Sequence, residues 1–155
     1  MAGTGASLAL SGSGMASLPA GLDLTNVTSD TWMGIGVEVT LPGPGRYQLD
    51  AVIRGAITVR ASPSNIVIRG RLWDVGAGAV VPSTLTVVDQ VFIAPGMPAD
   101  AVTGQNDNGV IMVDYAAAAP TTIRIEVNRL HAQGSESDSG IHPSTTLRWQ
   151  KIGWS

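Results

Sequence analysis

A strict two-residue alternation of apolar and polar side chains is the feature that most constrains how this chain folds. From Tyr47 to Val59 every odd position is apolar or glycine, whereas the even positions include Gln48, Asp50 and Arg54. Successive side chains of a β-strand point to opposite faces, so this spacing places one face on a core and the other towards water. A helix would mix these side chains around its surface. The segment is therefore predicted to be a half-buried strand.

The same alternation recurs along the chain, and turn-forming residues separate the alternating segments. Helical periodicity is scarce. Short strands divided by turns predict an all-β, antiparallel sandwich or barrel. Residues 84–93 and 109–117 are more continuously apolar, which is typical of central strands or of strands covered on both sides. The alternating segments are residues 33–41, 66–73, 122–128 and 147–150, and the predicted turns are residues 42–45, 62–65, 95–109 and 134–143.

Length and composition favour one domain preceded by an arm. A chain of 155 residues buries enough surface to support a core without disulfides or structural metal ions. The sequence has no Cys, which excludes disulfides, thiolate metal sites and cysteine nucleophiles. Residues 1–22 are rich in Gly, Ser and Ala and lack the basic start of a signal peptide, so we interpret them as an exposed flexible arm. The domain then comprises residues 23–155.

The chain carries few charges for its apolar content. Charged residues make up 14% of the sequence, against roughly 25% in typical soluble domains, while 44% of residues are hydrophobic. Two explanations stay open: a surface rich in small polar residues, or a large area hidden in an oligomer. The charges are scattered and Lys151 is the only Lys, so we expect no nucleic-acid partner. No apolar run reaches the roughly 18–20 residues of a membrane-spanning helix, so we expect no membrane partner.

No catalytic, cofactor-binding or metal-binding motif is present. His131 and His142 do not belong to an HxH or HExxH pattern, and the acidic turn at residues 105–109 lacks the spacing of a calcium loop. The loop at residues 135–139 has side-chain oxygens that suit either a cation, a sugar or plain solvation. There is no GxSxG elbow and no phosphate-binding loop. We therefore expect no enzyme, no cofactor and no metal site.

Residues 39–55, VTLPGPGRYQLDAVIRG, resemble the trimeric jelly-roll domains of the tumour-necrosis-factor and complement-head superfamily. In that superfamily an apolar strand, here Val37–Leu41, leads into a Pro/Gly turn and then into a Gly-x-Tyr strand that starts at Gly45. Residues 65–74, 109–131 and 144–153 are similar to the later strands, whereas residues 1–30 are not covered. The resemblance implies an antiparallel jelly-roll β-sandwich that forms a homotrimer, with one apolar and aromatic sheet facing the threefold axis.

Bacterial and phage members of this superfamily are commonly virion proteins. The resemblance therefore implies a structural protein of the virion surface, a capsid decoration or head fibre protein that binds a major capsid or tail protein through its arm. Three tryptophans are expected opposite the apolar stripe of their strands, covered either by a neighbouring element or by a second molecule. Trp32, Tyr47 and Trp149 are the candidate subunit-interface residues. The alternative function is a tail-fibre module that binds a receptor or host-surface glycan through an apical loop containing Trp73, Asp107 and Glu136.

Overall fold

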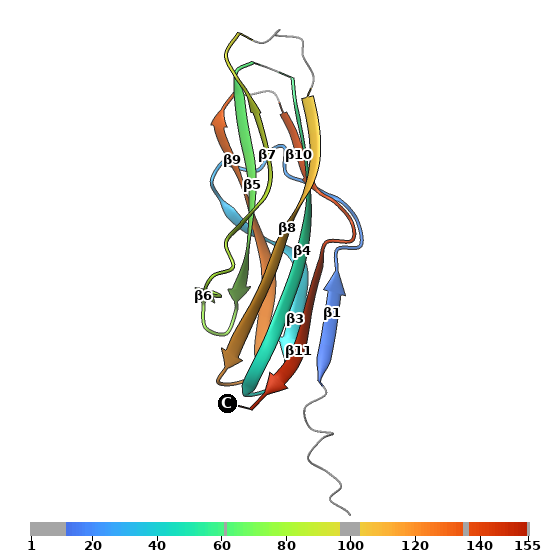
Figure 1. Ribbon diagram of the computed structural model, residues 1–155, viewed down its shortest axis with the longest axis vertical. Coiled ribbons are helices and arrows are strands. Elements are labelled where there is room, and N and C mark those ends of the chain that lie inside the picture. Colours follow the sequence, from blue (N-terminus) through green and yellow to red (C-terminus); the bar gives the residue numbers. More distant parts are fainter. Residues whose placement is uncertain (1–11, 61, 97–102, 135–136, 155) are drawn as a thin grey trace, which may run out of the picture.

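A computed structural model of the chain describes residues 12–60, 62–96, 103–134 and 137–154, in which all regular structure is β-strand. The strands form two antiparallel sheets (Figure 1), so the predicted all-β sandwich is confirmed. Sheet A contains β1 (Ser13–Ser17), β2 (Leu22–Asp23), β4 (Gly45–Val59), β8 (Thr103–Ala117), β10 (Ser137–Ile141) and β11 (Thr146–Gly153). Sheet B contains β3 (Trp32–Leu41), β5 (Ser64–Asp74), β6 (Ala79–Val80), β7 (Thr86–Ile93) and β9 (Thr121–Gln133). The chain crosses repeatedly between the sheets, from β3 through β4 to β5 and from β7 through β8 to β9, as in a jelly roll.

Strand β4 organises sheet A. All 15 of its residues pair with β8, from Gly45 opposite Ala117 to Val59 opposite Thr103. Its other edge pairs with β11 along the first half and with β10 along the second half. Because β8 follows β4 along this whole length, residues 105–109 are part of a strand, and the turn predicted for them is wrong. The loop predicted at residues 135–139 is likewise corrected from residue 137 onwards, where β10 begins.

Strand β9 has the same central place in sheet B. It pairs with β3 on one edge and with β5 on the other, and β7 and β6 extend the sheet beyond β5. The register puts Gly34 of β3 and Arg71 of β5 on either side of Glu126 in β9. Side chains of these three adjacent strands meet on the outer surface of the sheet, where Arg71 contacts both Trp32 of β3 and Glu126 of β9.

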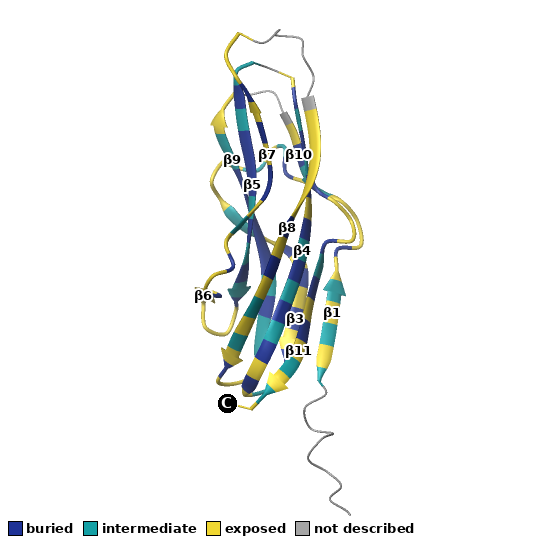
Figure 2. Cartoon of the chain, in the orientation of Figure 1, coloured by how far each residue is buried: buried dark blue, intermediate teal, exposed yellow. Residues whose placement is uncertain are grey.

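The core lies between the sheets and is built from the apolar stripes that the alternation predicts. Figure 2 shows buried positions recurring along β4, which runs through the middle of sheet A. Burying a side chain of the size of Leu or Ile contributes about 1.5–3 kcal/mol to stability, so these stripes supply most of the driving force for folding. The fully buried members include Val37, Leu41, Leu49, Ile53, Ile57, Ile66, Ile68, Leu72, Ile123, Ile125, Val127 and Leu147.

Two glycines on inward positions let the sheets approach closely. A Cβ atom on Gly70 of β5 would lie 2.4 Å from Cδ1 of Ile53 in sheet A and 3.2 Å from Cγ2 of Val88. A Cβ atom on Gly55 of β4 would lie 2.9 Å from Cγ1 of Val88. These contacts explain why glycine interrupts the apolar stripes of β4 and β5: the facing sheet occupies the volume that a side chain would need.

Part of the expected arm is a strand of the sandwich. Strand β1 pairs with β11, from Ser13 opposite Gln150 to Ser17 opposite Thr146. The backbone N–H of Leu18 then donates to the carbonyl of Thr145 at 2.8 Å. The sandwich therefore begins before residue 22, where the sequence placed the end of the arm, because the free edge of β11 satisfies the backbone groups of β1. Residues 1–11 lie outside the described residues.

Candidate interaction surfaces

The outer surface of sheet A carries several exposed apolar side chains among polar and charged ones. The strand registers arrange its outward residues in rows that run across β1, β11, β4 and β8. We call these residues the sheet A face. The central row contains Met15, Arg148, Asp50 and Met112, and its two neighbours contain Ser17, Thr146, Val52 and Val110 on one side and Ser13, Gln150, Gln48 and Asp114 on the other.

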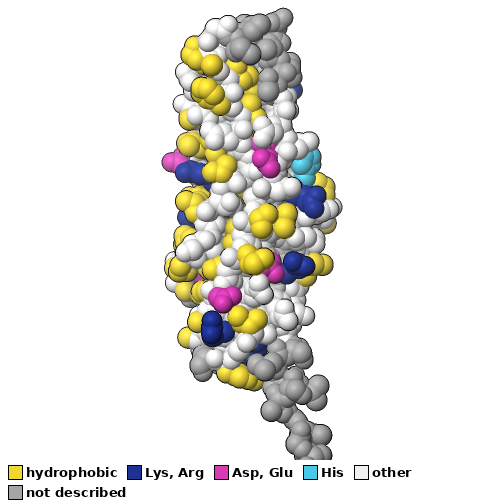
Figure 3. Space-filling model, viewed as in Figure 1, with side chains coloured by type: hydrophobic (Ala, Val, Ile, Leu, Met, Phe, Trp, Pro, Cys, Tyr) yellow, Lys and Arg dark blue, Asp and Glu magenta, His cyan; other side chains and the backbone are white. Residues whose placement is uncertain are grey.

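Three apolar side chains of the sheet A face stand in solvent. Met15, Val110 and Met112 are 65%, 62% and 70% exposed. Figure 3 views the molecule from the side on which these strands lie in front, and it shows hydrophobic side chains with only scattered charged groups between them. An exposed apolar surface rimmed by polar residues is typical of a protein–protein contact.

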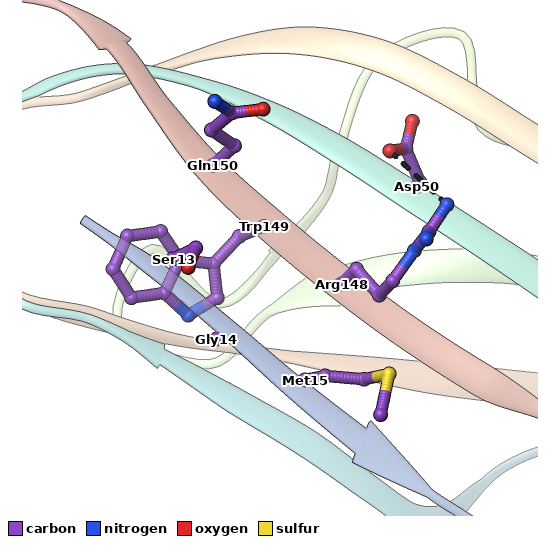
Figure 4. Close-up of a pocket in the computed structure, with 7 residues that line it drawn as sticks. All are labelled: Ser13, Gly14, Met15, Asp50, Arg148, Trp149 and Gln150. Carbon is purple, nitrogen blue, oxygen red and sulfur yellow. Dashed lines mark ion pairs between the residues drawn. The ribbon is translucent and has the colours of Figure 1, made fainter. Parts of the chain in front are cut away.

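A hollow of about 490 Å³ lies on the sheet A face beside β1 (Figure 4). Its lining includes Asp50 and Arg148, whose Oδ2 and Nη2 atoms are 3.7 Å apart. The Oδ1 atom of Asp50 is shielded from solvent and makes no hydrogen bond with a described residue. The ion pair is long and the side chain of Arg148 is exposed, so the pair contributes only about 0–1 kcal/mol to stability and Arg148 is available to a second molecule.

The outer surface of sheet B is organised differently, as a network of arginines and tryptophans. The guanidinium carbon of Arg71 lies 4.1 Å from the ring centroid of Trp32 and 5.2 Å from that of Trp73. Arg71 also donates to Oε2 of Glu126 at 2.7 Å, and Arg124 donates to Oε1 at 2.6 Å. Cation–π and charge-assisted contacts therefore cover Trp32 and Trp73 within the chain itself. The placement of Trp32 at a subunit interface stays a prediction.

Tyr47 and Trp149 lie inside the sandwich, and their prediction as interface residues is corrected. Tyr47 is fully buried, and its O–H group donates to the carbonyl of Gly43 at 2.6 Å. Trp149 is 9% exposed and meets Tyr47 edge-on, with ring centroids 5.5 Å apart. The register puts Trp149 on the inner face of β11, and β1 closes over it: a Cβ atom on Gly14 would lie 2.4 Å from its Nε1 atom.

The structure does not assemble the predicted apical loop. Trp73 lies in β5 of sheet B, whereas Asp107 lies in β8 of sheet A. Asp107 accepts a hydrogen bond from the backbone N–H of Asn108 at 2.7 Å. Glu136 lies outside the described residues. The two described residues are separated because β8 continues through the segment that was expected to form a loop.

Sequence reasoning missed a buried hydrogen-bonded group around Asp74 at the end of β5. The carboxylate accepts hydrogen bonds from the hydroxyl groups of Tyr115 and Thr121 and from the N–H of Ala77, the last at 2.9 Å. Burial acts to raise the pKa of Asp74, but these hydrogen bonds outweigh it and hold that pKa below its usual value. Burial, followed by the contact with Asp74, raises the pKa of Tyr115 to about 12. The group ties the β8–β9 hairpin to β5, and no sequence spacing predicts it.

The two histidines do not form a common site. The Nε2 atom of His131 lies 2.8 Å from Nη2 of Arg129, and burial together with the charge of Arg129 lowers the pKa of His131. His142 lies 3.4 Å from the side-chain oxygen of Asn106. Among the residues that the structure describes, no group of three or more His, Cys, Asp or Glu side chains could hold a metal ion. No helix of this described part is long and apolar enough to cross a membrane.

No protein-family model and no curated protein matches the sequence. Among solved structures, a chain of the infectious bursal disease virus VP2 subviral particle matches 94% of this chain with a TM-score of 0.45 and 7% identity. The structure of the Gt strain of the same virus matches 93% with a TM-score of 0.45 and 9% identity, and Eiger TNF from S. frugiperda matches 90% with a TM-score of 0.34 and 8% identity. This chain covers 38% of each of these two viral chains and 95% of the Eiger chain.

Proposed function

We propose that this chain is a self-assembling structural protein whose sheet A face forms the contact between the subunits of a homotrimer. The observation that carries the proposal is the exposure of Met15, Val110 and Met112 on the sheet A face. Removing apolar surface from water is favourable by about 25 cal/mol per Å².

The number three comes from the sequence resemblance at residues 39–55. Contacts between unlike surfaces of identical subunits close into a ring when the rotation between neighbours permits it, and three copies make a small closed ring. On the same basis we propose that the trimer is a structural protein of the virion surface, a capsid decoration or head fibre protein that binds a major capsid or tail protein. Three linked copies of an attachment segment would raise the effective concentration of each one at the particle.

The mass in solution, measured by light scattering, tests the assembly. The full-length chain is expected at about 48 kDa, three times the 15.9 kDa of one chain. Met112→Lys places an ammonium group in the proposed contact, opposite Asp50 of β4, where a lone chain tolerates it. We expect this variant to be a monomer, because burying the charge between subunits is unfavourable.

Phe92→Lys is the matched control for this test. Phe92 is 62% exposed, close to the 70% of Met112, but it belongs to β7 of sheet B. The control variant is expected to keep the trimer mass. A wild-type monomer would contradict assembly altogether, whereas equal loss of the trimer in both variants would contradict the use of the sheet A face.

A second candidate function is a receptor- or glycan-binding module of a tail fibre. Trp32 and Trp73, which are half-buried beside Arg71 on sheet B, favour it because aromatic rings and planar donors suit sugar rings. Binding to a cell-wall glycan that is lost in Trp73→Ala at unchanged solution mass would favour this function over a purely structural one.

A further inference from the structure

Along one side the two sheets meet without a strand pairing between the described residues. There β7 of sheet B runs beside β8 of sheet A, although β7 pairs with β5 and β8 pairs with β4. A Cβ atom on Gly109 of β8 would lie 3.0 Å from Thr86 and 3.0 Å from Val88, so the two strands are in close contact. We call this contact the β7–β8 seam. Because no strand pairing joins β7 to β8 in the described residues, only packing of buried side chains such as Val88 and Val91 holds this contact closed.

Asp89 of β7 is buried at the β7–β8 seam. The residue is 1% exposed, and neither carboxyl oxygen makes a hydrogen bond of normal geometry with a described residue. A Cβ atom on Gly55 of β4 would lie 3.1 Å from Cβ of Asp89, so the side chain starts against sheet A. A buried carboxylate without a partner is unfavourable, and it becomes tolerable either by taking up a proton or by reaching water.

A β-bulge explains why a carboxyl group occupies this position. The pairing of β7 with β5 shifts between Ile68 opposite Asp89 and Arg69 opposite Val87, which leaves Val88 as an extra residue. Both Val88 and Asp89 are buried, although strict alternation would turn one of them outwards. Bulges redirect side chains in this way and are frequent where a strand has a role beyond pairing.

The charged groups on the strands around Asp89 do not compensate its charge. On β5, the guanidinium of Arg69 pairs with Asp30 at 2.5 Å, on the outer surface of sheet B. On β4, Arg54 is exposed, and Arg60, which directly follows β4, pairs with Asp138. On β8, Asp107 adds a negative charge that disfavours ionisation of Asp89.

We propose that Asp89 is a pH-sensitive latch: the β7–β8 seam is closed while Asp89 holds a proton and loosens when Asp89 ionises. The inference stands on a buried carboxyl group that makes no hydrogen bond of normal geometry with a described residue, in a seam without strand pairing, and it is independent of the proposed function. Burial raises the pKa of Asp89 to about 6, and the charge of Asp107 adds to this effect while the backbone of Gln90 and Ile57 opposes it. Because the closed form favours the protonated acid, its extra stability is complete at low pH and is lost as pH rises through about 6.

Hydrogen exchange of the full-length chain, corrected for the intrinsic pH dependence of exchange, tests the latch. With a pKa of about 6 in the closed form and 3.8 in the open form, opening of the seam should become about tenfold more favourable between pH 5 and pH 7.5. Strand β7 pairs only with β5 among the described strands, so a loosened seam allows β7 to separate from β5 as well. We therefore expect this tenfold loss of protection in residues 86–93, and little change in β3, which lies at the far edge of sheet B. Unchanged protection of residues 86–93 would overturn the proposal.

Asp89→Asn removes the titrating group at nearly constant volume and should abolish the pH step. Asp114→Asn is the control on β8: Asp114 is exposed and pairs with Arg46 at 3.5 Å, so this variant should keep the step. If the step persisted in Asp89→Asn, another group would be responsible and the proposal would fail. Carbon-13 NMR titration of Asp89 in the wild type does not depend on any variant folding: a midpoint near 6 supports the latch, and one at or below 4 overturns it.

Discussion

Adding one methyl group at Gly70 tests the close approach of the two sheets. In Gly70→Ala the new Cβ atom would lie 2.4 Å from Cδ1 and 3.7 Å from Cγ1 of Ile53, and 3.2 Å from Cγ2 of Val88. Both neighbours are buried, so neither can move into solvent. Overpacking of this kind lowers the free energy of unfolding by about 1–3 kcal/mol. The unfolded chain has less conformational entropy with Ala than with Gly, which offsets about 0.4–1 kcal/mol of this loss. We therefore expect Gly70→Ala to lower the free energy of unfolding by about 1–2 kcal/mol.

A second substitution shows whether Ile53 is the cause. Ile53→Val removes the Cδ1 atom that the new methyl group meets, and by itself it should cost about 0.5–1.5 kcal/mol for the cavity. In the double variant the methyl group introduced by Gly70→Ala fills that cavity, so the two effects should not add. We expect the double variant to lie within about 1 kcal/mol of the wild type, which is a favourable coupling of about 1–2 kcal/mol.

Urea unfolding followed by circular dichroism, at one pH and one protein concentration, measures all four proteins of this cycle. Gly43→Ala is the control, because a Cβ atom there meets nothing within 4 Å, and it should change stability by less than about 0.5 kcal/mol. Additive effects of the two core substitutions, or a Gly70→Ala protein as stable as the wild type, would refute the claim that glycine is required for the sheets to meet at this point.

Three further predictions follow from single contacts. Gly14→Val drives a branched side chain into the indole of Trp149, so β1 should detach, and hydrogen exchange of residues 12–18 should rise at least tenfold while that of β4 stays the same. Glu126→Ala leaves Arg71 and Arg124 without the carboxylate that they share, and it should lower the free energy of unfolding in urea by about 2–3 kcal/mol. A loss below about 0.5 kcal/mol would contradict a structural role for Glu126. The pKa of Asp74 is lower in the folded chain than its usual value, so its contribution to stability is present above about pH 4 and is lost as pH falls. Asp74→Asn should therefore flatten the fall of the urea midpoint between pH 4 and pH 2.5. A urea midpoint that falls as steeply with pH as in the wild type would refute this.

The sequence alone determined the fold class and the central core, because alternation is a local property. A strand with apolar side chains at every second position can only be stable with one face buried, whichever strands lie beside it. The stripes of β4 and β9 could therefore be predicted from residues 47–59 and 122–128 without any knowledge of topology. The low charge of the chain likewise indicated in advance a surface that is either weakly polar or covered.

Only the tertiary structure decided which residues reach the surface. Residues 105–109 look like a turn by composition, but the long β4 offers backbone partners to them, and they become a strand. Trp149 is buried because β1 pairs with β11 over it, and Asp89 is buried because a bulge turns it inwards. The Asp74 group and the rows of the sheet A face join residues that lie far apart in the chain. Such contacts depend on register between strands, and a shift of one residue exchanges the two faces of a strand, so the local pattern cannot specify them.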